Sequence, residues 1–206
     1  MRMRAVYLIL TMALIATVSS IGSAQSLARG IELYRAYQYA EAERTLSQVI
    51  EAEPDNAQAR EYFGLALLGA GKIGEAEAAL SRAQELDPNS DSVKIGLARV
   101  FIEGKQFDRA EAALQEAAAL NKDNAEAPLY RGAIKLAQRN YQGAADDLTA
   151  ALSRNTNNAY AYYYAGLAWN GLRKPDKMIE SFQTFLKLAP GAPEAERVKS
   201  LLRSVR

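Results

Sequence analysis

The sequence predicts an all-α protein in which one pair of helices is repeated along the chain. Its 206 residues, 49% of them hydrophobic, suffice for a folded body of ordinary size. Internal repetition is the strongest signal. Blocks of 34 residues align without a gap, and they cover residues 23–56, 57–90, 91–124, 125–158 and 159–192. Because the same columns hold the same kinds of residue, we expect every block to fold in the same way.

Three columns of these blocks predict close helix packing. The eighth position holds Gly30, Gly64, Ala98, Gly132 and Gly166. The twentieth holds Ala42, Ala76, Ala110, Ala144 and Met178. The twenty-fourth holds Leu46, Leu80, Leu114, Leu148 and Phe182. Small residues let two helices approach each other, and a large apolar residue fills the space beside them. Each block therefore predicts two packed helices, A and then B.

The ends of the helices also have signals. The last position of the first four blocks holds Asn56, Ser90, Asn124 and Asn158, which are residue types that cap the N-terminus of a following helix. Pro54, Pro88 and Pro190 are expected to stop helix B, because proline has no N–H to continue it. After the last block, residues 193–206 carry apolar residues at helical spacing and predict a capping helix.

The first residues differ from the repeats. Arg2 and Arg4 precede an apolar stretch of about 14 residues, and small residues surround Ser23. The stretch is shorter than the roughly 20 residues that span a bilayer. We therefore expect a signal peptide at residues 1–24 and a repeat domain at 25–206, whose first repeat is 25–56. The protein is expected to be exported to the periplasm, with secretion as second choice and an uncleaved anchor as the alternative.

Composition excludes several kinds of chemistry. The chain has no Cys and no His, so thiol nucleophiles, imidazole bases, disulfides and the usual zinc sites are excluded. A net charge of +1 gives no reason to expect nucleic acid. Gly69, Gly71 and Gly74 match a dinucleotide-binding motif, but a predicted helix precedes them instead of a strand. The acidic pair Asp146 and Asp147 is expected on a solvated face. We predict no catalytic residues, no cofactor and no metal, and hence no enzyme.

The columns resemble the tetratricopeptide repeat family, and the resemblance covers all five blocks. It implies an α-solenoid, a right-handed superhelix of five helix pairs and the capping helix. It also implies that the second, fifth, ninth and twelfth positions of helix A line a concave groove. The residues expected to bind a partner there are Leu65, Leu68, Ile95, Arg99, Ile102, Leu129, Leu136, Tyr160, Tyr163 and Leu167. Each of the apolar residues has packing in the core as an alternative.

The resemblance extends to small proteins of the bacterial cell envelope. It implies an interaction scaffold or adaptor that binds a peptide segment or a helix, with self-association as a variant. The alternative is a module for a glycan or a hydrophobic ligand, suggested by four tyrosines within residues 160–164 and by Trp169. Packing is expected for Tyr162 and Trp169, whereas packing and binding both remain open for Tyr160 and Tyr163.

Overall fold

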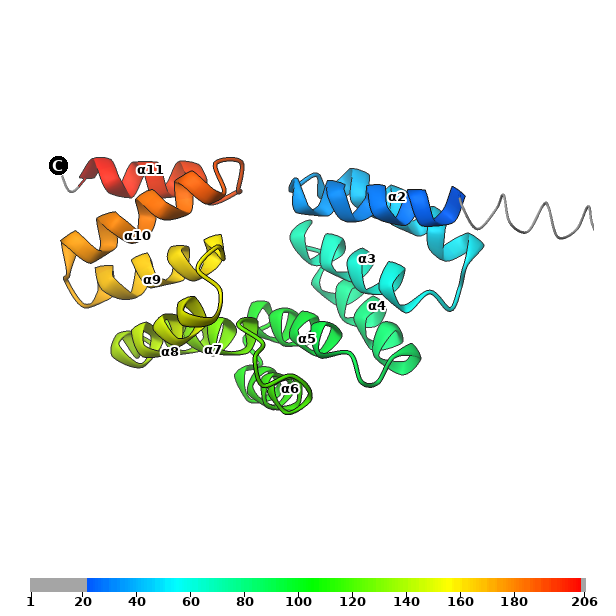
Figure 1. The fold of residues 1–206 in the computed structure, drawn as a ribbon, viewed down its shortest axis with the longest axis horizontal. Helices are drawn as coiled ribbons and strands as arrows, with labels where there is room; N and C mark the ends of the chain where they lie inside the picture. Colours follow the sequence, from blue (N-terminus) through cyan, green and yellow to red (C-terminus); the bar gives the residue numbers. More distant parts are fainter. Residues whose placement is uncertain (1–21, 205–206) are drawn as a thin grey trace, which may run out of the picture. The chain divides into compact units, whose positions relative to one another are not determined.

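The computed structural model describes residues 22–204, and this part of the chain contains helices and no strand. A helix at residues 22–35 comes first. It is followed by α2 (Tyr39–Ala52), α3 (Ala57–Gly69), α4 (Ile73–Leu86), α5 (Asp91–Glu103), α6 (Phe107–Leu120), α7 (Glu126–Ala137), α8 (Tyr141–Arg154), α9 (Ala159–Gly171), α10 (Pro175–Leu188) and α11 (Ala195–Ser204) (Figure 1). The B helices α2, α4, α6, α8 and α10 all begin at the same position of their blocks. The predicted fold of five helix pairs and a C-terminal capping helix is confirmed.

Most of the predicted signal peptide, residues 1–21, lies outside the described residues. Gly22, Ser23 and Ala24, at the predicted cleavage site, belong to the helix at residues 22–35. No helix between residues 22 and 204 has the length and hydropathy needed to cross a membrane.

The chain forms two compact units, and the boundary between them in the sequence falls between Leu86 and Asp87. Unit 1 contains repeats 1 and 2. Unit 2 contains repeats 3, 4 and 5 together with α11. Within unit 2 the A helices follow one another, since α5 contacts α7 and α7 contacts α9.

The predicted small and large columns form the core of each repeat. Ala76 and Ala144 of helix B are completely buried. A Cβ atom on Gly64 would lie 2.7 Å from Leu80, and one on Gly166 would overlap the ring of Phe182. The large residue of helix B therefore occupies the space that a side chain on helix A would need. Met178, which replaces alanine in repeat 5, is also buried.

The turn from helix A to helix B has one backbone conformation in all five repeats. Its fifteenth position has a left-handed φ between 56° and 78°, and the residues are Tyr37, Gly71, Lys105, Arg139 and Arg173. The following residue donates its N–H to a carbonyl five residues back, as Asn140 does to Lys135 at 2.8 Å. This is the Schellman pattern of helix ends, which favours glycine at the left-handed position. Only repeat 2 has glycine there, so the columns of the sequence did not reveal this turn.

The helix ends confirm the predicted caps, with one shift. The side chains of Asn56, Ser90 and Asn158 each accept a hydrogen bond from the N–H three residues later. In repeat 4, Asn124 accepts from Glu126 at 2.7 Å as well, and α7 begins one residue late. The role expected of proline needs correction. Helices α6 and α8 end at the same repeat position as the others although no proline follows, so proline is not what sets this position.

Candidate partner-binding surface

The fifth position of helix A belongs to the core in unit 2. Ile95, Leu129 and Tyr163 are 2%, 1% and 6% exposed, respectively. At these three positions the structure favours the core alternative that the sequence left open. Their side chains are packed inside the protein and leave little surface for a partner to contact.

The ninth and twelfth positions present the accessible part of the predicted surface. In unit 2, Ile102 and Leu136 occupy the twelfth position of α5 and α7, and both are partly exposed. Leu167, at the ninth position of α9, is partly exposed too. In unit 1, Leu68 on α3 is partly exposed, whereas Leu65 is buried. The accessible apolar surface is therefore narrower than the sequence predicted.

Arg99 adds a charge to this surface. It lies at the ninth position of α5 and is partly exposed. Its guanidinium carbon is 5.6 Å from the ring centroid of Tyr130 on the neighbouring helix α7. A cation over an aromatic face is attracted by the ring's negative quadrupole. The contact orients Arg99 beside the apolar residues of α5 and α7.

The tyrosines of α9 pack mainly against their own repeat. The ring centroid of Tyr163 lies 5.3 Å from that of Phe185 and 6.4 Å from that of Phe182. Tyr160 donates its hydroxyl hydrogen to Glu194, just before α11, at 2.9 Å. Burial raises the pKa of Tyr163, and it raises the pKa of Tyr164 to about 12. Tyr160 thus joins α9 to the segment that leads into α11.

Other polar groups of repeat 5 are engaged as well. The ammonium groups of Lys174 and Lys177 lie 5.2 and 4.6 Å from the ring centroid of Trp169. Asn158 accepts a hydrogen bond from Ala161 as the predicted cap of α9. These contacts favour a packing role for this end of the chain.

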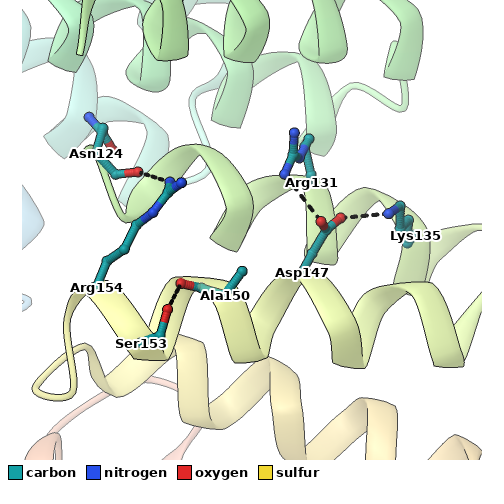
Figure 2. A network of polar contacts seen from close by, with 7 residues as sticks. All are labelled: Asn124, Arg131, Lys135, Asp147, Ala150, Ser153 and Arg154. Carbon is teal, nitrogen blue, oxygen red and sulfur yellow. Dashed lines mark hydrogen bonds and ion pairs between the residues drawn. The ribbon is translucent and has the colours of Figure 1, made fainter. Parts of the chain in front are cut away.

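A polar network joins the two helices of repeat 4 (Figure 2). Asp147 on α8 is approached by Arg131 at 3.2 Å and by Lys135 at 2.7 Å, both from α7. Its side chain is only 13% exposed. In the same view, Arg154 donates to the carbonyl oxygen of Asn124 at 2.9 Å. The expectation of a solvated acidic pair is therefore wrong for Asp147, which balances two cations inside the repeat. It holds for Asp146, which is exposed.

The glycine motif also has a structural explanation. A Cβ on Gly69 would meet the ring of Tyr39 at 2.5 Å, and Gly71 takes the left-handed position of the turn. Gly74 has open space around it. The motif begins at the last residue of α3 and ends in the first turn of α4, so it spans the turn between two helices. Within residues 22–204, no group of acidic side chains could hold a metal ion.

A second group of tyrosines, in unit 1, was not found from the sequence. The ring centroid of Tyr34 lies 6.0 Å from that of Tyr39 and 5.7 Å from that of Tyr62, and Tyr37 and Tyr39 are 6.3 Å apart. Tyr62 comes from the next repeat, so only the fold brings the group together. We call these four residues the unit 1 tyrosine cluster.

Comparison with known sequences matches the chain to tetratricopeptide repeats. One profile of this repeat matches residues 27–91 and 134–193, and a second matches residues 67–130. No curated protein matches the sequence.

Solved structures show similarity of fold. TTC0263, a thermophilic tetratricopeptide repeat protein of Thermus thermophilus, is 16% identical with a TM-score of 0.75, and the match covers 88% of this chain and 97% of that one. MamA is 22% identical with a TM-score of 0.53 over 84% and 94% of the two chains. A chain of the APC/C hetero-tetramer Cut9–Hcn1 is 19% identical with a TM-score of 0.75, over 89% of this chain and 36% of that chain. Identities this low establish the fold alone.

Proposed function

The chain belongs to the tetratricopeptide repeat family, and on this basis we propose that it is an interaction scaffold of the bacterial cell envelope. Proteins of this family generally mediate protein–protein interactions and are typically non-enzymatic. The proposed site is the helix A surface of unit 2. The proposed ligand is a peptide segment or a helix of another protein, and no catalysis is involved.

The observation that carries this proposal is the accessible apolar stripe on α5, α7 and α9. Ile102, Leu136 and Leu167 remain partly exposed, while the fifth-position residues of the same helices are buried. A rigid core below an accessible apolar stripe lowers the entropy cost of binding, because the side chains are already in place. Arg99 lies beside the stripe and can pair with a carboxylate or a backbone carbonyl of the partner.

The stripe suits a partner that presents apolar side chains on one face. An amphipathic helix does this with residues three and four apart, and an extended segment does it with alternate residues. The polar network of repeat 4 fixes α7, the helix that carries Leu136, because Asp147 ties α7 to α8 through Arg131 and Lys135. Self-association through the same stripe is a variant of this proposal.

Two substitutions on the stripe test the proposed site. Ile102→Glu combined with Leu136→Glu is expected to abolish capture of a crosslinked partner from envelope extract, while helicity by circular dichroism is unchanged. The matched control combines Leu120→Glu with Leu188→Glu, which places the same two charges at residues that are 44% and 39% exposed. Unchanged capture by the double variant contradicts the proposed site. Equal loss with the control would show that added charge, rather than the stripe, is responsible.

Export is the second part of the proposal, and it rests on the features of residues 1–24. The whole chain, expressed in a bacterium with two membranes, is expected in the periplasmic fraction with a mass that corresponds to residues 25–206. A cytosolic chain with the mass of the whole sequence contradicts export. A membrane-bound chain that keeps residues 1–24 would instead indicate the uncleaved anchor.

Glycan binding is the alternative function if the capture experiment finds no protein partner. If neither the wild-type chain nor the control captures a protein, envelope glycans are the next ligands to measure. Tyrosine resonances of α9 that shift on glycan addition would favour this alternative over the scaffold.

A further inference from the structure

The turn of repeat 1 contains an open pocket of about 430 Å³ that is outside the proposed partner surface. It is lined by Tyr37, Gln38, Tyr39, Ala40, Glu41 and Ala70. The first five are the fifteenth to nineteenth positions of repeat 1, and Ala70 is the fourteenth position of repeat 2. The pocket lies wholly within unit 1.

The same hollow recurs in repeat 3 with a different lining. There a pocket of about 340 Å³ is lined by Lys105, Gln106, Phe107, Asp108, Arg109 and Gln138, the equivalent positions. The fold therefore makes the hollow, and the side chains decide its chemistry. In repeat 1 the lining has two tyrosines and one carboxylate, whereas in repeat 3 it has two cations and one carboxylate.

The walls of the repeat 1 pocket are held in place. The rings of Tyr37 and Tyr39 are nearly perpendicular, at 87°, with centroids 6.3 Å apart. The ring of Tyr39 occupies the space where a Cβ on Gly69 would lie. Tyr39 also contacts the ring of Tyr34 behind it. The two rings thus form a fixed corner before any ligand arrives.

The polar groups of the pocket make it negative. Glu41 is exposed and forms no ion pair with another residue between 22 and 204. Its neighbour Glu43 is already paired with Lys72 at 2.7 Å. Gln38 stands at the N-cap position of α2 but makes no cap hydrogen bond with its side chain. At the equivalent position of repeat 4, Asn140 does cap its helix, by accepting from Gly143.

We propose that this pocket binds an arginine side chain of a protein partner. The guanidinium lies in the corner of Tyr37 and Tyr39, where ring faces attract a cation. Its N–H groups donate to the Glu41 carboxylate and to the side-chain carbonyl of Gln38. The methylene stem of the arginine packs on the methyl groups of Ala40 and Ala70. This inference is independent of the proposed partner surface, which lies in unit 2.

The test uses the whole chain and the probe peptide acetyl-Gly-Arg-Gly-amide, with the ring resonances of tyrosine and phenylalanine followed by NMR. The peptide is expected to shift the resonances of Tyr37 and Tyr39 in a saturable way and to leave those of Phe107 unchanged. The peptide with citrulline in place of arginine has nearly the same shape without the charge. It is expected to bind at least about fivefold more weakly, as befits the loss of one exposed ion pair.

Two variants separate the charge from the rings. Glu41→Gln is expected to weaken arginine binding about fivefold, because only the charge is removed. Tyr37→Asn keeps a residue that tolerates the left-handed turn and is expected to remove saturable binding. Citrulline binding as tight as arginine, or wild-type affinity in Glu41→Gln, overturns the proposal. A neutral oligosaccharide that shifts the same resonances while the arginine peptide does not also overturns it, in favour of a glycan site.

Discussion

The two units each gather four tyrosines, and the two groups differ in what surrounds them. The unit 1 tyrosine cluster comes from two repeats and borders an open pocket. The α9 tyrosines lie within residues 160–164 and pack against Phe182, Phe185 and the approach to the capping helix. Density of aromatic residues along the sequence is therefore a poor guide to a binding surface. Whether a tyrosine is packed or accessible depends on whether the neighbouring helix places a large or a small residue beside it.

The difference has a local cause. On α9, helix B of the same repeat contributes two phenylalanines, so the tyrosines add to the hydrophobic core. In repeat 1 the pocket is bordered by Ala40 and Ala70, whose methyl groups leave space beside the rings. The same residue type thus stabilises the fold in one unit and lines an accessible hollow in the other.

The largest expected effect comes from removing a ring from each group. Tyr163→Ala should lower the free energy of unfolding by about 3 kcal/mol or more, because it deletes a buried aromatic side chain. Tyr37→Ala should lower it by less than about 1 kcal/mol, since Tyr37 is partly exposed. Urea denaturation of the two variants measures both. Equal losses would show that the two groups do not differ as described.

The next largest effect is expected at alkaline pH, where ionisation of Tyr164 on α9 should lower the stability of the folded chain. The pKa of Tyr164 is about 12 in the folded chain and 10.0 for the unperturbed side chain. Because the folded pKa is the higher one, this contribution to stability is complete below pH 10 and is lost as the pH rises towards 12. The loss should reach about 2 kcal/mol, after allowance for the partial exposure of the residue.

The comparison between wild type and Tyr164→Phe isolates this effect, since other tyrosines and lysines titrate in the same range. Chemical denaturation at several pH values should show the wild type losing more stability than the variant above pH 10. The ultraviolet absorbance of ionised tyrosine should also lack one late-ionising component in the variant. Parallel curves for the two proteins would contradict the raised pKa of Tyr164.

The smallest expected effect concerns the left-handed turn. Arg139→Gly should raise stability by about 0.5–1 kcal/mol, because glycine adopts a φ of 60° without the cost that a side chain adds. Tyr37→Gly should gain the same relief but lose the ring contact with Tyr39, so its net change should be near zero. Thermal melting checks both values.

The same two glycine variants also distinguish an effect on stability from an effect on peptide binding. The Tyr37→Gly variant should no longer bind the arginine peptide, whereas the Arg139→Gly variant should bind it with unchanged affinity. A Tyr37→Gly chain that still binds the peptide would show that this ring contributes nothing to the pocket.

Much of the fold could be predicted from the sequence because its signals are local. The regular period, the small residues such as Gly64 and Ala76, and the caps such as Asn56 each act within one or two neighbouring helices. The left-handed turn was missed because four of its five residues are not glycine. The proline rule was too strong, since α6 and α8 end without one.

The candidate surface was predicted less well, for a different reason. A periodic pattern places a residue on one face of a helix, but it does not say how much of that face the next helix covers. Ile95 and Ile102 lie on the same predicted face of α5, yet the first is buried and the second is partly exposed. Likewise, the sequence predicted a solvated Asp147, whereas in the structure this carboxylate pairs with two cations of α7.

The sequence by itself determined the all-α class, the five helix pairs and the small-against-large packing inside each pair. These features depend on helix propensity, capping and contacts at a fixed spacing, which are all encoded within one period. Only the tertiary structure decided which helix A residues remain accessible, that Asp147 is paired with two cations of α7, and that Tyr62 joins the tyrosines of repeat 1. Those outcomes depend on side chains from a second helix, and a single repeat contains no information about how closely that helix approaches.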